Sequence, residues 1–382
     1  MKRCASLLLI FVMLLGMVGC SKPPVQPPEV PAETQWHSTG DIIITAQQAD
    51  EIIGGEYQTP KNVILIIGDG MGPNDIFLAE SYAEGTYDFG LVMNRIVNHG
   101  LCTTYSADNE VTDSAASGTA LSTGIKTNNG TIGKDANGQD IRVMLETAKS
   151  AGKKVGIVTD DYITGATPSA FMTHCENRKN EEELINNILS FPPDVLIGRY
   201  NADHHAKAVK KGYLTAIDVS LFAKTLNEAQ TLPKVFVGFN GGSKQVPDNE
   251  LAYSAQTALK LLENENGFFL MIEGCGQDKY GHDNIMNGKI NSVSNLDRTV
   301  AAVLLYMQEH PDTLLIITSD HETGGVQLPA EGITPTDALF TTTSHTGTPV
   351  RVFAVGQGSE YFRDTTVDNT DVAKFIIAAL TK

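Results

Sequence analysis

Residues 62–72, N-V-I-L-I-I-G-D-G-M-G, carry the clearest structural signal in this chain of 382 residues. An unbroken run of branched apolar side chains that ends in glycines is typical of a strand buried on both faces, with a loop at its carboxyl end. Asp69 lies in that loop. Because ligands bind beyond the carboxyl ends of strands in open α/β sheets, Asp69 is the first candidate site residue.

Strand-like and helix-like segments alternate along the rest of the chain. Further apolar runs occur at 155–158, 195–197, 235–237, 268–272, 314–317 and 350–355. Helical patterns occur at 141–151, 181–189, 251–262, 290–308 and 372–380. This alternation predicts an α/β fold, a three-layer sandwich in which helices cover both faces of a central, mostly parallel sheet. We assign the folded domain to residues 41–382.

The segment at about 198–249 interrupts this alternation. It is rich in glycine and polar residues, so we expect an irregular insertion or surface loops there. His204 and His205 lie in this segment, and we expect them at the surface. His37, His99 and His310 are interpreted as ordinary polar residues without a role in the site.

The N-terminus predicts export. Lys2 and Arg3 precede an apolar run that extends to Val18. This run is shorter than the roughly 20 residues that a helix needs to span a bilayer, so residues 1–19 are interpreted as a signal peptide.

The apolar run ends at Gly19-Cys20, a pattern similar to the lipobox of bacterial lipoproteins. We therefore expect a lipidated Cys20, with a plain secretory signal as the alternative. The proline-rich stretch that completes residues 20–40 is typical of an extended tether. Together these features predict an exported protein, lipid-anchored at the periplasmic or extracellular face of a bacterial membrane.

Charge argues against a nucleic-acid-binding protein, and cysteine content argues against a disulfide-stabilised one. The net charge of −17 argues against nucleic acid as a specific partner, because phosphate backbones are bound through excess positive charge. The cysteines after Cys20 are Cys102, Cys175 and Cys275, and they have no C-x-x-C spacing. We expect buried free thiols and no disulfide framework.

The stretch V-T-D-S-A-A-S-G at 111–118 predicts the start of a helix. Thr112 and Asp113 suit the cap, which would place Ser114 in the first turn, where backbone N–H groups lack helical partners. Such a turn binds anions, so Ser114 is a candidate nucleophile. On this segment alone, an ordinary serine-rich helix start is an equal alternative.

Carboxylate and imidazole side chains follow several of the apolar runs. They are Asp69, Glu273, Asp278, His282, Asp320 and His321, with His345 shortly before the run at 350–355. A single aspartate at a strand end is commonly a cap or turn residue, but this whole set would converge on one edge of the sheet. Mixed carboxylate and imidazole ligands suit zinc, whereas oxygen ligands suit magnesium.

These blocks resemble those of bacterial alkaline phosphatases over nearly the whole chain after residue 60. The shared blocks, in family order, are G-D-G-M-G around Asp69, T-D-S-A-A-S around Ser114, A-T-P at Thr167 followed by His174 and Arg178, I-E-G-x-x-x-D-K-x-x-H at 272–282, S-D-H at 319–321 and S-H-T-G around His345. The resemblance implies a site for two zinc ions and one magnesium ion. The implied ligands are Asp278, His282 and His345 for one zinc, Asp69, Ser114, Asp320 and His321 for the second, and Asp69, Thr167 and Glu273 for magnesium.

The resemblance also implies hydrolysis of small-molecule phosphate monoesters through a phosphoserine at Ser114. Arg178 would clamp the phosphate, Asp113 would position Arg178, and Lys279 would reach the phosphate through water. The chain departs from the family at Gly165, where many members place Asp or His, so we expect weaker magnesium binding. A homodimer is left open.

Other functions are kept as alternatives. A phosphodiesterase or phosphonate hydrolase of the same superfamily is the main one. A sulfatase is disfavoured because the residues around Ser114 lack the C/S-x-P-x-R pattern. A non-catalytic lipoprotein that binds phosphate or metal is a remote alternative.

Overall fold

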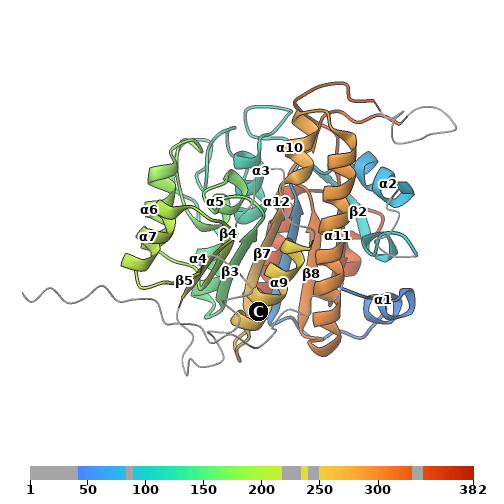
Figure 1. The fold of residues 1–382 in the computed structure, drawn as a ribbon, viewed down its shortest axis with the longest axis horizontal. Coiled ribbons are helices and arrows are strands. Elements are labelled where there is room, and N and C mark those ends of the chain that lie inside the picture. The colour runs from blue at the N-terminus through green and yellow to red at the C-terminus, as the bar shows by residue number, and fades with distance from the viewer. Residues whose placement is uncertain (1–41, 83–88, 217–233, 240–248, 329–338) are drawn as a thin grey trace, which may run out of the picture. The chain divides into compact units, whose positions relative to one another are not determined.

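The computed structural model describes residues 42–82, 89–216, 234–239, 249–328 and 339–382. The predicted signal peptide and Cys20 lie outside these residues. The strands of the main sheet are β1 (Asn62–Gly68), β2 (His99–Thr103), β3 (Lys154–Thr159), β4 (Val195–Arg199), β5 (Leu214–Ala216), β6 (Val235–Phe239), β7 (Phe268–Gly274), β8 (Thr313–Thr318), β11 (Val350–Val355) and β12 (Thr366–Asp368). Within the described residues they form a ten-stranded sheet in the order β12-β2-β11-β8-β1-β7-β3-β4-β6-β5 (Figure 1).

Helices cover both faces of this sheet. They are α1 (Ala46–Ile53), α2 (Pro73–Tyr82), α3 (Ser114–Thr123), α4 (Met144–Ser150), α5 (Ala166–Met172), α6 (Glu181–Ser190), α7 (Ala202–Lys210), α9 (Glu250–Leu262), α10 (Gly276–His282), α11 (Met286–Glu309) and α12 (Asn369–Leu380). Figure 1 shows α9 and α11 across one face of the central strands.

Strand β1 shows why helices must cover both faces of the sheet. All its residues are buried, and successive side chains point to opposite faces. Ile64 and Ile66 belong to a core cluster shared with α1, α2, α9 and α11. Val63 and Leu65 belong to a second cluster, shared with α4, α5, α6 and α12. The predicted α/β fold with a mostly parallel sheet is confirmed.

The candidate site lies at the edge where the parallel strands end. Strand β1 pairs in parallel with β7 and β8, and β7 pairs in parallel with β3. Strand β11 runs antiparallel to β8, with Phe353 opposite Ile317. The amino end of β11 therefore lies at the same edge as the carboxyl ends of its neighbours. This reversal explains how His345, which precedes β11, can join residues that follow the parallel strands.

The segment at about 198–249 is more regular than expected. Its described residues include α7, β5 and β6, and both strands belong to the main sheet. The expected surface position of His204 and His205 is wrong, because both are buried. The ring of His205 stacks on Phe236, with centroids 4.0 Å apart, so β6 covers it.

Two strands at one end of the sheet, β2 and the edge strand β12, were not foreseen. Strand β2 alternates between buried and exposed residues, and β12 has three residues, so neither has an apolar run. Cys102, Cys175 and Cys275 are free and buried, as expected. Among the described residues, no helix is both long and apolar enough to cross a membrane.

Candidate active site

Ser114 is the first residue of α3, as the sequence predicts. Asp113 is the N-cap, and its Oδ1 accepts a 2.9 Å hydrogen bond from the backbone N–H of Ala116. The other oxygen, Oδ2, accepts from Gly130 N–H at 3.0 Å and from Arg178 Nη1 at 3.1 Å. Asp113 thus joins the helix start to the arginine, which fixes Arg178 next to the candidate nucleophile.

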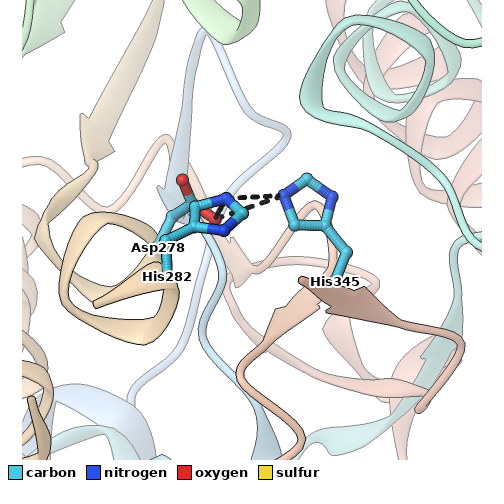
Figure 2. A group of neighbouring side chains, drawn as sticks. All are labelled: Asp278, His282 and His345. Carbon is cyan, nitrogen blue, oxygen red and sulfur yellow. Dashed lines mark hydrogen bonds and ion pairs between the residues drawn. The ribbon is translucent and has the colours of Figure 1, made fainter. Parts of the chain in front are cut away.

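The side chains of Asp278, His282 and His345 converge beyond the carboxyl ends of the parallel strands (Figure 2). Oδ1 of Asp278 lies 3.2 Å from His282 Nε2 and 3.3 Å from His345 Nε2, and the two Nε2 atoms are 3.2 Å apart. The Nδ1 atoms face backbone carbonyls, of Thr343 at 2.6 Å and Thr112 at 2.9 Å. Because a carbonyl only accepts, each Nδ1 carries the hydrogen, and each Nε2 points a lone pair at the centre.

His321 completes a second group. Its Nδ1 lies 3.2 Å from Thr323 Oγ1, and that hydroxyl donates its hydrogen to Asp278. The hydroxyl oxygen therefore accepts a hydrogen from Nδ1, and Nε2 again carries the lone pair. That Nε2 lies 3.2 Å from Ser114 Oγ, 3.2 Å from Asp320 Oδ2 and 3.6 Å from Asp69 Oδ1. Imidazole nitrogens and carboxylate oxygens therefore face one another around the serine.

The carboxylates of Asp69 and Asp320 fit a bound cation. Within the described part of the chain, Asp69 Oδ1 and Asp320 Oδ2 are buried without a hydrogen-bond partner. Burial, and then repulsion from Asp320 and Asp278, raises the pKa of Asp69 well above its ordinary value. Burial raises the pKa of Asp320 to about 7, with Asp278 adding to the effect. Buried acceptors crowded in this way need positive charge, which is what metal ions supply.

Asp69 also faces the group expected to hold magnesium. Its Oδ2 lies 3.5 Å from Thr167 Oγ1, near the start of α5. Glu273, at the end of β7, accepts a short hydrogen bond from Thr159 Oγ1. Burial raises the pKa of Glu273 to about 8, although the Thr159 hydroxyl lowers it, and nearby Asp161 raises it further.

A short strand pair brings His345 into the site. Strands β9 (Glu322–Thr323) and β10 (His345–Thr346) are antiparallel, with His345 opposite Thr323. The rings of His321 and His345 stack with centroids 3.6 Å apart. All the candidate residues named from the sequence thus gather at one edge of the sheet.

Sequence reasoning missed several residues that contact this set, among them Thr323 and Asp161. Thr323 Oγ1 donates a 2.7 Å hydrogen bond to Asp278 Oδ1, and Asp161 Oδ2 lies 2.7 Å from Lys279 Nζ. Asp161 shortly follows the apolar run at 155–158, so the strand-end rule could have found it. Nothing in the sequence around Thr323 signals its contact with Asp278.

Comparison with known proteins shows the family to which this chain belongs. Residues 60–213 and 237–339 match the family model described as alkaline phosphatase. The chain belongs to the alkaline phosphatase family. It is 34% identical over 312 residues to alkaline phosphatase 3 of Bacillus subtilis (strain 168), an alignment that covers 75% of this chain and 66% of that relative. It is 30% identical over 405 residues to alkaline phosphatase H of Pseudomonas aeruginosa (strain UCBPP-PA14). That alignment covers 84% of this chain and 85% of that relative.

Solved structures of this family have the same fold. The alkaline phosphatase of the Antarctic bacterium TAB5 superposes with a TM-score of 0.74 at 29% identity, covering 85% of this chain and 99% of that one. A variant of the TAB5 enzyme has Mg bound in its M3 site. The chain spans 66% and 63% of the lengths of two Bacillus subtilis relatives, alkaline phosphatases 3 and 4.

Proposed function

We propose that this protein hydrolyses phosphate monoesters in a metal-dependent reaction through a phosphoserine at Ser114. One observation carries the proposal: Ser114 Oγ lies 3.2 Å from His321 Nε2, inside a ring of carboxylate oxygens and imidazole lone pairs. A serine in these surroundings is suited to nucleophilic attack once cations fill the centre. Membership in the alkaline phosphatase family supports the same reaction.

Two zinc ions and one magnesium ion fit the donor atoms. The proposed ligands are Asp278, His282 and His345 for one zinc, Asp69, Ser114, Asp320 and His321 for the other, and Asp69, Thr167 and Glu273 for magnesium. Bound there, the ions would favour the ionised serine and stabilise the attacking and leaving oxygens of an in-line displacement. Asp69 would be shared between two ions, which agrees with its place between His321 and Thr167.

The protein groups perform the rest of the reaction. Ser114 Oγ gives up its proton and forms a bond to phosphorus while the bond from phosphorus to the alcohol oxygen breaks, and the alcohol leaves with a proton. Water then loses a proton and attacks the same phosphorus, Ser114 Oγ leaves and regains a proton, and inorganic phosphate is released. Arg178 can bind two phosphate oxygens in a fork, and Asp113 holds it beside Ser114.

The test is a substrate panel with metal analysis of the purified protein. We expect turnover of p-nitrophenyl phosphate and much slower turnover of bis-p-nitrophenyl phosphate and of a phosphonate monoester. We also expect two zinc ions per chain, with one magnesium ion when magnesium is supplied in the buffer. Preferred turnover of the diester would establish the phosphodiesterase alternative. Stoichiometric phosphate binding without turnover would establish a binding protein.

We also propose that the protein is exported and lipid-anchored through Cys20. The apolar run closed by Gly19-Cys20 and the proline-rich stretch after it support this proposal. Mass spectrometry of the mature N-terminus tests it. An unmodified N-terminus at another residue would exclude the anchor without affecting the proposed reaction.

A further inference from the structure

We propose that Asp161 is a positioning residue for the phosphate-binding site, because its carboxylate holds Lys279 in place and offsets its charge. This inference deepens the proposed function and rests on it. Lys279 Nζ lies 2.7 Å from Asp161 Oδ2, and the two side chains are only 21% and 25% exposed. The Nζ atom itself is buried and has no hydrogen-bond partner among the described residues, so its 2.7 Å contact with Asp161 is an ion pair.

Lys279 is placed by the metal site's own helix. It follows Asp278 in α10, a helix of seven residues that ends at His282. A lysine fixed to this helix cannot move far without moving the candidate ligands. The direction of its side chain is therefore set mainly by what pairs with Nζ.

Asp161 is itself held by other elements. Its backbone N–H donates a 3.0 Å hydrogen bond to Thr159 Oγ1, and its carbonyl accepts a 2.8 Å bond from the N–H of Arg199 in β4. Its Oδ1 lies 3.6 Å from Arg199 Nη1. Asp161 is thus fixed by backbone contacts and lies between two cations, so its carboxylate is a rigid partner for Lys279.

The same loop reaches the proposed magnesium ligands. Thr159 Oγ1, which accepts from Asp161 N–H, donates to Glu273. Gly165 has no side chain to offer. The carboxylate of this loop at ion-pair distance from Lys279 is that of Asp161, and the buried Asp160 carboxyl also interacts with the lysine. Asp161 makes its contact with Thr159 through its backbone N–H, so a side-chain substitution at 161 keeps the link to Glu273 and acts on the lysine.

Electrostatics predicts the direction of the effect. A phosphate dianion binds where positive charge exceeds negative charge, and Asp161 cancels the charge of Lys279 at short range. A neutral residue at 161 would remove the ion-pair partner of the lysine, so less of its positive charge would be offset near a bound anion. Inorganic phosphate should then bind more tightly and leave more slowly.

The experiment is a double-mutant cycle read by calorimetric titration of inorganic phosphate into the metal-loaded protein. The variants are Asp161→Asn, Lys279→Met and the double variant, with Asp203→Asn as a control on an exposed carboxylate that pairs with Lys207. We expect Asp161→Asn to lower the phosphate Kd about three- to tenfold, a size typical of coupled contacts. In the Lys279→Met background the same change should alter Kd less than about twofold, since the partner is gone.

Two results would overturn the proposal. One is an unchanged phosphate Kd in Asp161→Asn, and the other is an equal change with and without Lys279. Thermal unfolding checks that each variant folds, and Asp161→Ser supplies a second neutral side chain if the asparagine variant does not. Wild-type turnover of p-nitrophenyl phosphate tests the proposed function separately, so its failure is distinguishable from failure of the cycle.

Discussion

Oγ of Ser114 lies 3.2 Å from Nε2 of His321, although the two residues belong to a helix start and a strand end that are 207 positions apart in the chain. We expect Ser114→Ala to abolish phosphoenzyme formation and to lower monoester turnover by about three orders of magnitude or more, because the covalent step needs that oxygen. Mass spectrometry of acid-quenched protein and steady-state kinetics measure both effects. Ser190→Ala, at the end of α6, is the matched control and should behave as wild type. Phosphate trapped on another residue of the wild-type protein would contradict the assignment.

Removal of the metal ions should make stability depend on pH. Burial raises the pKa of Asp320 to about 7 and that of Glu273 to about 8, from ordinary values of 3.8 and 4.5. At pH values between the ordinary and the raised pKa, the unfolded chain binds fewer protons than the folded protein. The free energy of unfolding therefore falls as pH rises through this range. We expect the chelated protein to unfold at a lower temperature at pH 8 than at pH 5.

Zinc and magnesium should reverse this trend, because they take the place of protons on the crowded carboxylates. Thermal unfolding at the two pH values, with and without chelator, measures the effect. Equal unfolding temperatures of the chelated protein at both pH values would show that the pKa values of these carboxylates are not raised in the folded protein.

A buried ion pair supports the loop that carries Asp69. Lys289 Nζ lies 2.5 Å from Asp75 Oδ2, both side chains are fully buried, and Nζ also donates to the carbonyls of Gly70 and Thr323. We expect Lys289→Met to destabilise the protein by about 3–5 kcal/mol, because it leaves the Asp75 carboxylate buried and unpaired. Urea unfolding measures the change.

The control for that variant is Lys207→Met, which removes exposed ion pairs with Glu182 and Asp203. Exposed pairs contribute little to stability, so its urea midpoint should stay close to that of wild type. Equal effects of the two substitutions would rule out a special role for the buried lysine.

Gly165 can be tested by restoring a carboxylate. Its φ of −52° suits any residue, and a Cβ there would lie 3.0 Å from the carbonyl oxygen of Tyr162, so a small local shift would admit a side chain. If magnesium is held weakly because this position lacks an acidic group, Gly165→Asp should lower the magnesium concentration for half-maximal activity by about 10- to 100-fold.

Gly165→Ala is the matched control, because it adds the Cβ without the carboxylate. It should keep the magnesium requirement of wild type. If the wild-type protein retains stoichiometric magnesium through extensive dialysis and added magnesium does not activate it, the weak-site interpretation is wrong.

Local sequence determined the elements that carry the chemistry. The unbroken apolar run of β1 specifies a strand buried on both faces, because only a two-sided environment removes all these side chains from water. Asp113 determines where α3 begins, since its side chain satisfies an N–H of the first turn, and this places Ser114 at the helix start. Hydrophobic periodicity and capping act over a few residues, so both could be predicted without a structure.

Tertiary structure decided which of these residues meet. His345 reaches the site only because β11 runs antiparallel to β8 and because β10 pairs with β9. The burial of His205 depends on β6, and the pairing of Asp161 with Lys279 joins residues from two separate segments. These contacts depend on strand direction, register and packing between distant segments, which local residue patterns do not encode.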